Sequence, residues 1–223
     1  MLFALAQPVV FVGLLVAFLL ALVVRAYAIR ISARALGLLP RGESVTPRPR
    51  EDIDPFGAVA AAVGGVGWGK AIDIDEVPRF RGRGRAAWVF AAGPLATLIL
   101  SQVLLLVFRL VYPFALGPIS PSSVLTGAIS GEYGAQFLLA VAVGLLAFGL
   151  LALIPVPPLD GFGLLWLAVR RPGRGMLGYR LWFEDKNLGV VVLLACCFFP
   201  LGAPFLLIPI DLVGGLVLRA WSS

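Results

Sequence analysis

The sequence predicts an all-α polytopic membrane protein, and two observations support that fold class. Hydrophobic residues make up 60% of the 223 residues, and the mean hydropathy is +0.99, whereas apolar residues are near half of a soluble domain. The apolar residues gather in long runs, and about 20 in succession are enough for a helix to cross a bilayer. We therefore expect a single integral membrane domain over residues 1–223, with about four to five transmembrane helices.

Four apolar runs are the expected spans. They cover residues about 5–29, 86–111, 135–159 and 188–218. The first run contains one polar residue before Val24, Gln7, and it ends in arginines rather than in the small residues of a cleavage site, so we interpret it as a retained span. The last run is interrupted at residues 199–204 and is either one kinked span or a hairpin of two short helices.

The segment after the first span contains a glycine-rich apolar stretch, residues 58–69, that is too short to cross a bilayer. Irregular backbone at membrane depth has to be covered by protein. We therefore expect a re-entrant segment or a short β-hairpin here. Residues 70–77 alternate apolar and polar side chains, which favours a short strand.

The positive charge is unevenly placed along the chain. Eighteen Lys and Arg give a net charge of +6, and they gather in residues 25–85 and 170–186, whereas residues 112–134 contain none. Lys and Arg concentrate on the cytoplasmic side of membrane proteins. We expect the N-terminus outside and the 25–85 loop in the cytoplasm.

A basic stretch directly precedes the second span. Its arginines are Arg79, Arg81, Arg83 and Arg85. A glycine–arginine stretch can bind nucleic acid, but one that adjoins a membrane span is better placed to contact anionic headgroups. We expect these arginines to contact lipid or a partner protein, and we expect no nucleic acid partner.

Residues that could hold a cofactor are scarce. The sequence contains no histidine, which is the commonest metal ligand and the usual acid or base at neutral pH. Its two cysteines, Cys196 and Cys197, are adjacent and provide no disulfide framework. We expect neither a metal nor another cofactor.

Asp160 is a lone carboxylate at the end of the third apolar run, in ALIPVPPLDGFG. A carboxylate at membrane depth costs about 2.5–3.5 kcal/mol on insertion scales, so it needs a cation, hydrogen bonds or a proton. The alternative is that Asp160 lies at the interface and caps a helix over residues 161–170.

Four stretches resemble those of a known family, in the same order and at similar spacing. They are IDPFG (residues 53–57), GWGK (67–70), AAGPLATLIL (91–100) and LIPVPPLDG (153–161). Together they are similar to the site-2 proteases, which are intramembrane zinc metalloproteases, and the resemblance covers nearly the whole chain. It implies a site-2-protease-like core and, because the order of spans is that of small bacterial forms, a bacterial inner membrane location.

In that family an H-E-x-x-H motif provides two zinc ligands and a general base, and the Asp of the L-D-G element is the third ligand. Aligned through the tripeptide ALG, the two His positions fall on Arg25 and Ile29, and the Glu position on Ala26. A supporting Asn falls on Ala152, so Asp160 alone matches the ligand set. One carboxylate does not make a catalytic zinc site, and the resemblance therefore implies a pseudoprotease rather than an enzyme.

The same alignment suggests what replaces the metal. Arg25 and Asp160 fall where the family brings ligands together around one ion, and a guanidinium can bind a carboxylate through two hydrogen bonds. We expect an ion pair between Arg25 and Asp160, with Arg30 or Arg34 as the fallback partner.

Three functions follow from this interpretation. The first is an inactive accessory or scaffolding subunit of a larger membrane complex, in contact with lipid and with other integral membrane subunits. The second is a regulatory pseudoprotease that binds single-span client helices. The least favoured is an active intramembrane metalloprotease with unusual ligands.

Overall fold

The computed structural model describes residues 1–38, 44–75, 77, 82–113, 119–198 and 204–222. The described residues form helices and turns with one isolated bridge and no strand. Three helices in this part of the chain are long and apolar enough to cross a membrane, namely α1 (Pro8–Ala35), α4 (Arg83–Val111) and α6 (Tyr133–Ala152). The predicted all-α membrane fold is confirmed, with three such helices where four to five were expected.

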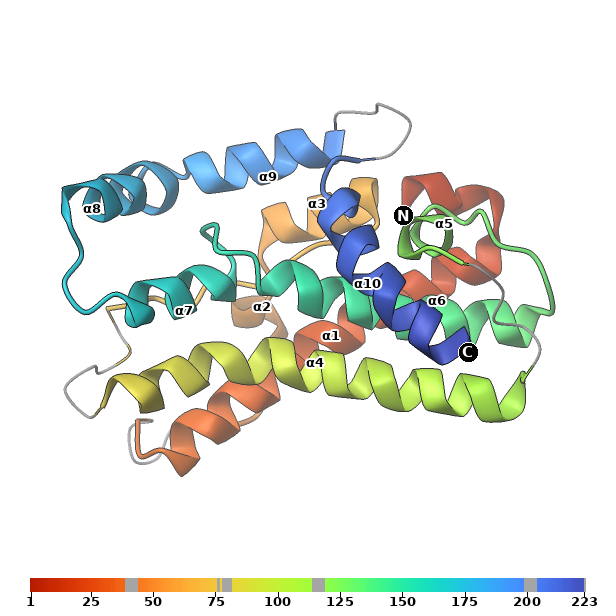
Figure 1. The fold of residues 1–223 in the computed structure, drawn as a ribbon, viewed down its shortest axis with the longest axis horizontal. Helices are drawn as coiled ribbons and strands as arrows, with labels where there is room; N and C mark the ends of the chain where they lie inside the picture. Colours follow the sequence, from red (N-terminus) through yellow and green to blue (C-terminus); the bar gives the residue numbers. More distant parts are fainter. Residues whose placement is uncertain (39–43, 76, 78–81, 114–118, 199–203, 223) are drawn as a thin grey trace.

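The three long helices pack against one another, and α6 is the central one (Figure 1). Most of α6 is buried, and its sequence is apolar on every side, as expected for a helix surrounded by protein. The helix α4 instead exposes an apolar stripe at three- to four-residue spacing, made of Leu95, Ile99, Val103, Leu106 and Leu110. An exposed apolar stripe of this length is typical of a surface that contacts lipid or another protein.

The third expected span ends earlier than predicted. The helix α6 stops at Ala152 rather than Leu159, and the proline-rich residues 153–159 form turns. Prolines inside a helix remove backbone donors and clash with the preceding turn, which explains the break. A new helix, α7 (Asp160–Ala168), begins at Asp160.

The segment after α1, which we call the re-entrant segment after the prediction above, folds as a short helix and a reversal followed by extended chain, and not as a β-hairpin. A short helix, α2 (Pro49–Asp52), leads to α3 (Pro55–Gly64), whose first turn is capped by the Asp54 carboxylate. Gly65, at a φ of +82°, reverses the chain, which returns to a single bridge between Ile53 and Gly69. Proline in the first turn and an aspartate cap favour a helix over a strand, and the described part of residues 70–77 contains no strand either.

The C-terminal part adds short helices to the three-helix core. These are α8 (Arg174–Arg180), the π-helical turn η3 (Leu181–Asp185), α9 (Leu188–Phe198) and α10 (Leu207–Ser222). The expected run 188–218 is thus two helices, neither of which is long enough to be a candidate span, and the interruption at residues 199–203 lies outside the described residues. Two further short elements are η1 (Leu2–Ala6) and α5 (Pro121–Leu125). They lie at the end of the core where α1 begins (Figure 1).

Several arginines lie at one end of the molecule. The end of α1, the start of α4, the end of α7 and all of α8 lie toward that end, at the left of Figure 1. We call this end the basic end, and define it by Arg30, Arg34, Arg83, Arg85, Arg170, Arg171 and Arg174. The protein is an integral membrane protein, and the placement of this end in the cytoplasm remains a prediction.

Candidate functional site

Arg25 and Asp160 are 135 positions apart in the sequence and contact each other directly. The Arg25 Nε atom donates to Asp160 Oδ2 at 2.7 Å, and Nη2 donates to Oδ1 at 2.5 Å. Arg25 is 6% exposed and Asp160 is 3% exposed. Both carboxylate oxygens are therefore satisfied by one guanidinium in the bidentate geometry that Arg favours.

Two glycines make room for the Arg25 side chain. A Cβ atom added to Gly93 on α4 would lie 2.7 Å from Arg25 Cγ, and one added to Gly69 would lie 3.0 Å from Arg25 Nη1. Gly69 belongs to the chain that returns from α3. The sequence showed a glycine inside the second span, where it allows close helix packing, but gave no sign that an arginine stem lies against it.

The other positions aligned with the zinc motif are apolar. Ile29 lies one turn after Arg25 on the same side of α1. Both side chains lie against Gly93, where an added Cβ atom would be 3.3 Å from Ile29 Cδ1. Ala26 is buried on α1, and Ala152 is buried at the end of α6. None of these three side chains offers a ligand atom.

A second ion pair lies next to the first on α1. Arg30 Nη2 and Nη1 donate to the two carboxylate oxygens of Asp52, at 2.6 and 3.0 Å. Arg30, the fallback partner for Asp160, is therefore used to hold α2 against α1. The sequence gave no indication of this pair, which depends on how the segment after α1 turns back.

The residues around Asp160 do not fit a zinc ion. In the part of the chain that the structure describes, no three His, Cys, Asp or Glu side chains lie close enough to hold a metal. Both Asp160 oxygens accept hydrogen bonds from a guanidinium, whose positive charge would repel a cation placed there. A catalytic zinc needs three protein ligands and an open position.

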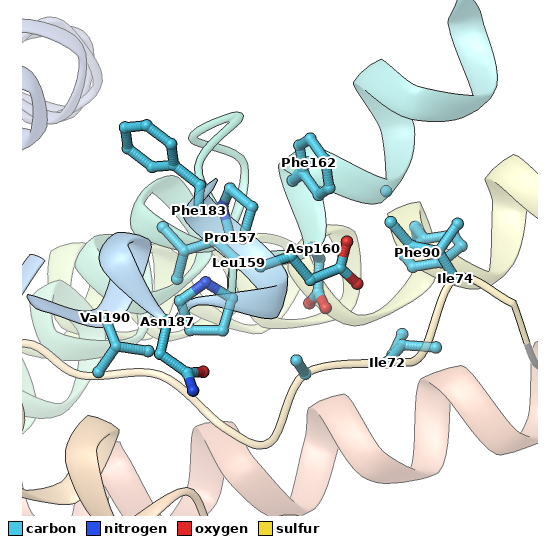
Figure 2. A pocket seen from close by; sticks show the side chains of 14 residues that line it. Ile72, Ile74, Phe90, Pro157, Leu159, Asp160, Phe162, Phe183, Asn187 and Val190 are labelled. Atoms are coloured by element: carbon cyan, nitrogen blue, oxygen red, sulfur yellow. The ribbon is translucent and has the colours of Figure 1, made fainter. Parts of the chain in front are cut away.

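A small cavity of about 110 Å³ lies beside Asp160. Figure 2 shows Asp160 at its edge, with the apolar side chains of Phe90 and Phe162 nearby and Asn187 on the far side. Ile72 and Ile74, from the chain that follows the re-entrant segment, close another side. The volume is enough for a few waters or one side chain, and it is far below that of a helix.

An arginine cluster near this cavity was not anticipated from the sequence. Arg180 Nη2 lies 2.6 Å from an oxygen of Asp75, and its Nε atom lies 2.9 Å from one of Glu184. Its guanidinium also stacks on Trp166, with the Cζ atom 5.2 Å from the ring centroid. The hydrogen bond to Asp75, more than the attraction of Glu184, raises the pKa of Arg180 above its usual value.

The pKa of Glu184 is shifted by a different cause from that of its partner Arg180. Burial raises the pKa of the Glu184 carboxyl, and this outweighs the lowering by Arg180. Glu184 loses hydration where it meets the guanidinium, which accounts for the upward direction of its pKa.

The basic stretch before the second span is partly described. Arg79 and Arg81 lie outside the described residues. Arg83 donates from Nη2 to the backbone oxygen of Leu167 in the last turn of α7, whereas Arg85 is exposed. Arg83 thus ties α4 to α7 and satisfies a carbonyl at a helix C-terminus, and Arg85 remains available for lipid or a partner.

The fold and the pair define a helical membrane protein whose first span is joined by a buried ion pair to the helix after its third. The chain is 27% identical over 161 residues to a Bacillus subtilis (strain 168) protein described as "Putative zinc metalloprotease YwhC", a match that covers 71% of this chain and 67% of that protein. No family model matches the chain, and no solved structure matches it. The similarity supports a site-2-protease-like family, as the motifs indicated.

Proposed function

We propose that this protein is a catalytically inactive, site-2-protease-like membrane protein that acts as an accessory or scaffolding subunit of a larger membrane complex. The observation that carries the inactivity is the bidentate pair of Arg25 and Asp160. By the motif alignment, these two residues fall at positions where the site-2 proteases that the chain resembles hold zinc. The guanidinium links α1 to α7 as a metal would, without providing a Lewis acid or an activated water.

The scaffolding role is supported by the apolar surface of the long helices. The stripe on α4 is matched by exposed side chains on α1, namely Val12, Leu15, Val16, Leu19 and Val23. Such faces suit lipid or other transmembrane helices, since helices in membranes associate by side-chain packing. In the part of the chain that the structure describes, the exposed apolar helix faces are the largest surface available, so we expect partner helices to bind there.

A second candidate is a regulatory pseudoprotease that binds single-span client helices. The cavity beside Asp160 favours it, because it lies between α7 and the chain after the re-entrant segment. Its volume of about 110 Å³ would take one client side chain, not a helix. The client would therefore have to unwind or displace residues 71–74 to reach Asp160.

Metal content tests the inactivity. The full-length protein, purified in mild detergent without chelator, should contain far less than one zinc per chain when its metal content is measured by elemental mass spectrometry. The variant R25H/A26E/I29H is the positive comparator, because it places two imidazoles on one face of α1 near Asp160. Stoichiometric zinc in the unaltered protein would overturn the proposal.

Photo-crosslinking separates the two roles. A benzophenone amino acid at Ile99 reports on the outer stripe of α4, and one at Asn187 reports on the cavity. A scaffolding subunit should give a discrete stoichiometric adduct from Ile99 in native membranes and none from Asn187. Adducts from Asn187 alone would instead support client binding, and a protein that gives neither and runs as a monomer would contradict both.

A further inference from the structure

The helical segment α8–η3 has two faces of different character. Its inner face packs on α7, where the Tyr179 ring lies 5.6 Å from that of Phe162 and its hydroxyl donates to Pro155 O at 3.1 Å. Its outer face is apolar and open, since Leu177, Leu181 and Trp182 are 53%, 48% and 53% exposed. Leu177 and Leu181 lie at i and i+4 on one side of the helix, and Trp182 follows directly; we call these three exposed side chains the stripe of α8–η3.

Basic residues flank this stripe at both ends. Arg170, Arg171 and Arg174 are exposed just before or at the start of α8. At the other end, the Lys186 Nζ atom lies 3.8 Å from the centroid of the Trp182 ring. Tryptophan rings and long basic side chains that keep their charged ends in water are enriched at the membrane–water interface.

The position of α8 in the fold places the stripe at the level where the spans end. In Figure 1, α8 lies at the basic end, beside the last turn of α7 and at the same end as the first turn of α4. Three exposed arginines lie before or at the start of α8. At the η3 end, Asp75 and Glu184 pair with Arg180, and the exposed Asp185 lies beside Lys186. An anionic partner is therefore favoured over a cationic or neutral one.

We propose that the outer face of α8–η3 binds anionic phospholipid, with Leu177, Leu181 and Trp182 at the acyl boundary and the flanking Arg and Lys side chains on the headgroups. The inner face contacts the rest of the protein through the pair of Arg180 with Asp75 and through the rings of Tyr179 and Phe162. Within the segment itself, Arg180 pairs with Glu184, and the rings of Tyr179 and Phe183 stack with centroids 4.4 Å apart. This inference is independent of whether the protein is catalytic.

The test uses the full-length protein in nanodiscs of phosphatidylcholine, with or without phosphatidylglycerol, whose acyl chains are brominated to quench tryptophan fluorescence. The difference between the unaltered protein and W182F isolates Trp182 from the other four tryptophans. We expect Trp182 to be quenched, and more strongly when phosphatidylglycerol is present. An unquenched Trp182 in both bilayers would overturn the proposal and show that water or a protein partner covers the stripe.

A matched pair of triple variants tests the charge. R170Q/R171Q/R174Q should weaken the apparent affinity for phosphatidylglycerol, measured by native mass spectrometry in detergent, by about tenfold or more, because each basic residue at the surface adds to binding. R48Q/R50Q/K70Q removes the same charge from the loop after α1 and should change it far less. Equal losses in the two variants would mean that net charge alone attracts the lipid, and would overturn the assignment to α8.

Discussion

Two arginine–carboxylate clusters in this protein have similar distances and different surroundings. Arg25 and Asp160 approach to 2.5 Å with side chains 7% and 1% exposed, whereas Arg180 approaches Asp75 to 2.6 Å with the aspartate side chain 68% exposed. When a surface pair is broken, water solvates both charges, and the loss is small. When a buried pair is broken, the remaining charge has no partner. Burial, rather than distance, should therefore decide what each cluster contributes.

The largest expected effect is at the buried pair. D160A leaves the Arg25 guanidinium buried without its counter-ion and should lower the free energy of unfolding by about 3–5 kcal/mol. The measurement is the thermal unfolding midpoint of the purified protein in detergent, followed by a thiol-reactive dye at Cys197, which is buried in the folded protein.

The matching control removes both charges. R25M/D160L fills the same space with apolar side chains and should recover most of the stability lost in D160A, because a buried ion pair is often no more stable than an apolar replacement. If the double variant is as unstable as D160A, the pair is not the reason for the loss, and the comparison with the surface cluster fails.

An intermediate effect is expected at Arg30 and Asp52, whose side chains are 19% and 18% exposed. D52N weakens the bonds from both Arg30 nitrogen atoms and should cost about 1.5 kcal/mol, the order of a hydrogen bond to a charged group. The unfolding midpoint should fall between those of D160A and the surface variants. A cost as large as that of D160A would show that exposure does not rank these pairs.

The comparison also explains what the sequence could and could not predict. The pair of Arg25 and Asp160 followed from motif positions, since the family brings those positions to one ion. The Arg180 cluster was missed because its partners come from a loop at residue 75 and a π-helical turn, and no sequence pattern relates them. The spans were found by hydropathy. The break after Ala152 was not predicted, because a proline does not always end a helix: Pro94 lies inside α4, and that helix continues.

The re-entrant segment shows the same limit. Glycines and apolar residues at 58–69 predicted a covered, non-spanning segment, which the structure contains. Whether it would be helix or hairpin depended on Asp54, whose carboxylate accepts from Phe56 N at 2.8 Å and from Trp68 Nε1 at 2.9 Å. The second bond joins residues 14 apart, and it exists only once the chain has turned back.

A small effect is expected at the surface cluster. R180Q removes the ion pairs to Asp75 and Glu184 and the stacking on Trp166, and should cost about 0.2–1 kcal/mol, because the charge of Asp75, whose side chain is 68% exposed, is solvated once it is released. The same thermal midpoint measures it, with D75N as the control for the more exposed partner. A loss that approaches that of D160A would show that Arg180 holds α8 and η3 onto the core.

The smallest effect is a pH dependence at Glu184. Its pKa is raised by burial, despite Arg180, with Asp185 and Asp73 adding repulsion. Between the usual glutamate pKa and the raised one, the folded state holds more protons than the unfolded state, so stability falls as pH rises through that window. E184Q should remove this slope, which cannot exceed about 1.4 kcal/mol per pH unit for one proton.

R180Q should steepen the slope, because Arg180 is the one neighbour in the described part of the chain that lowers the pKa of Glu184. Unfolding midpoints across this window decide the matter, and a slope that E184Q leaves unchanged would assign the pH dependence to another group.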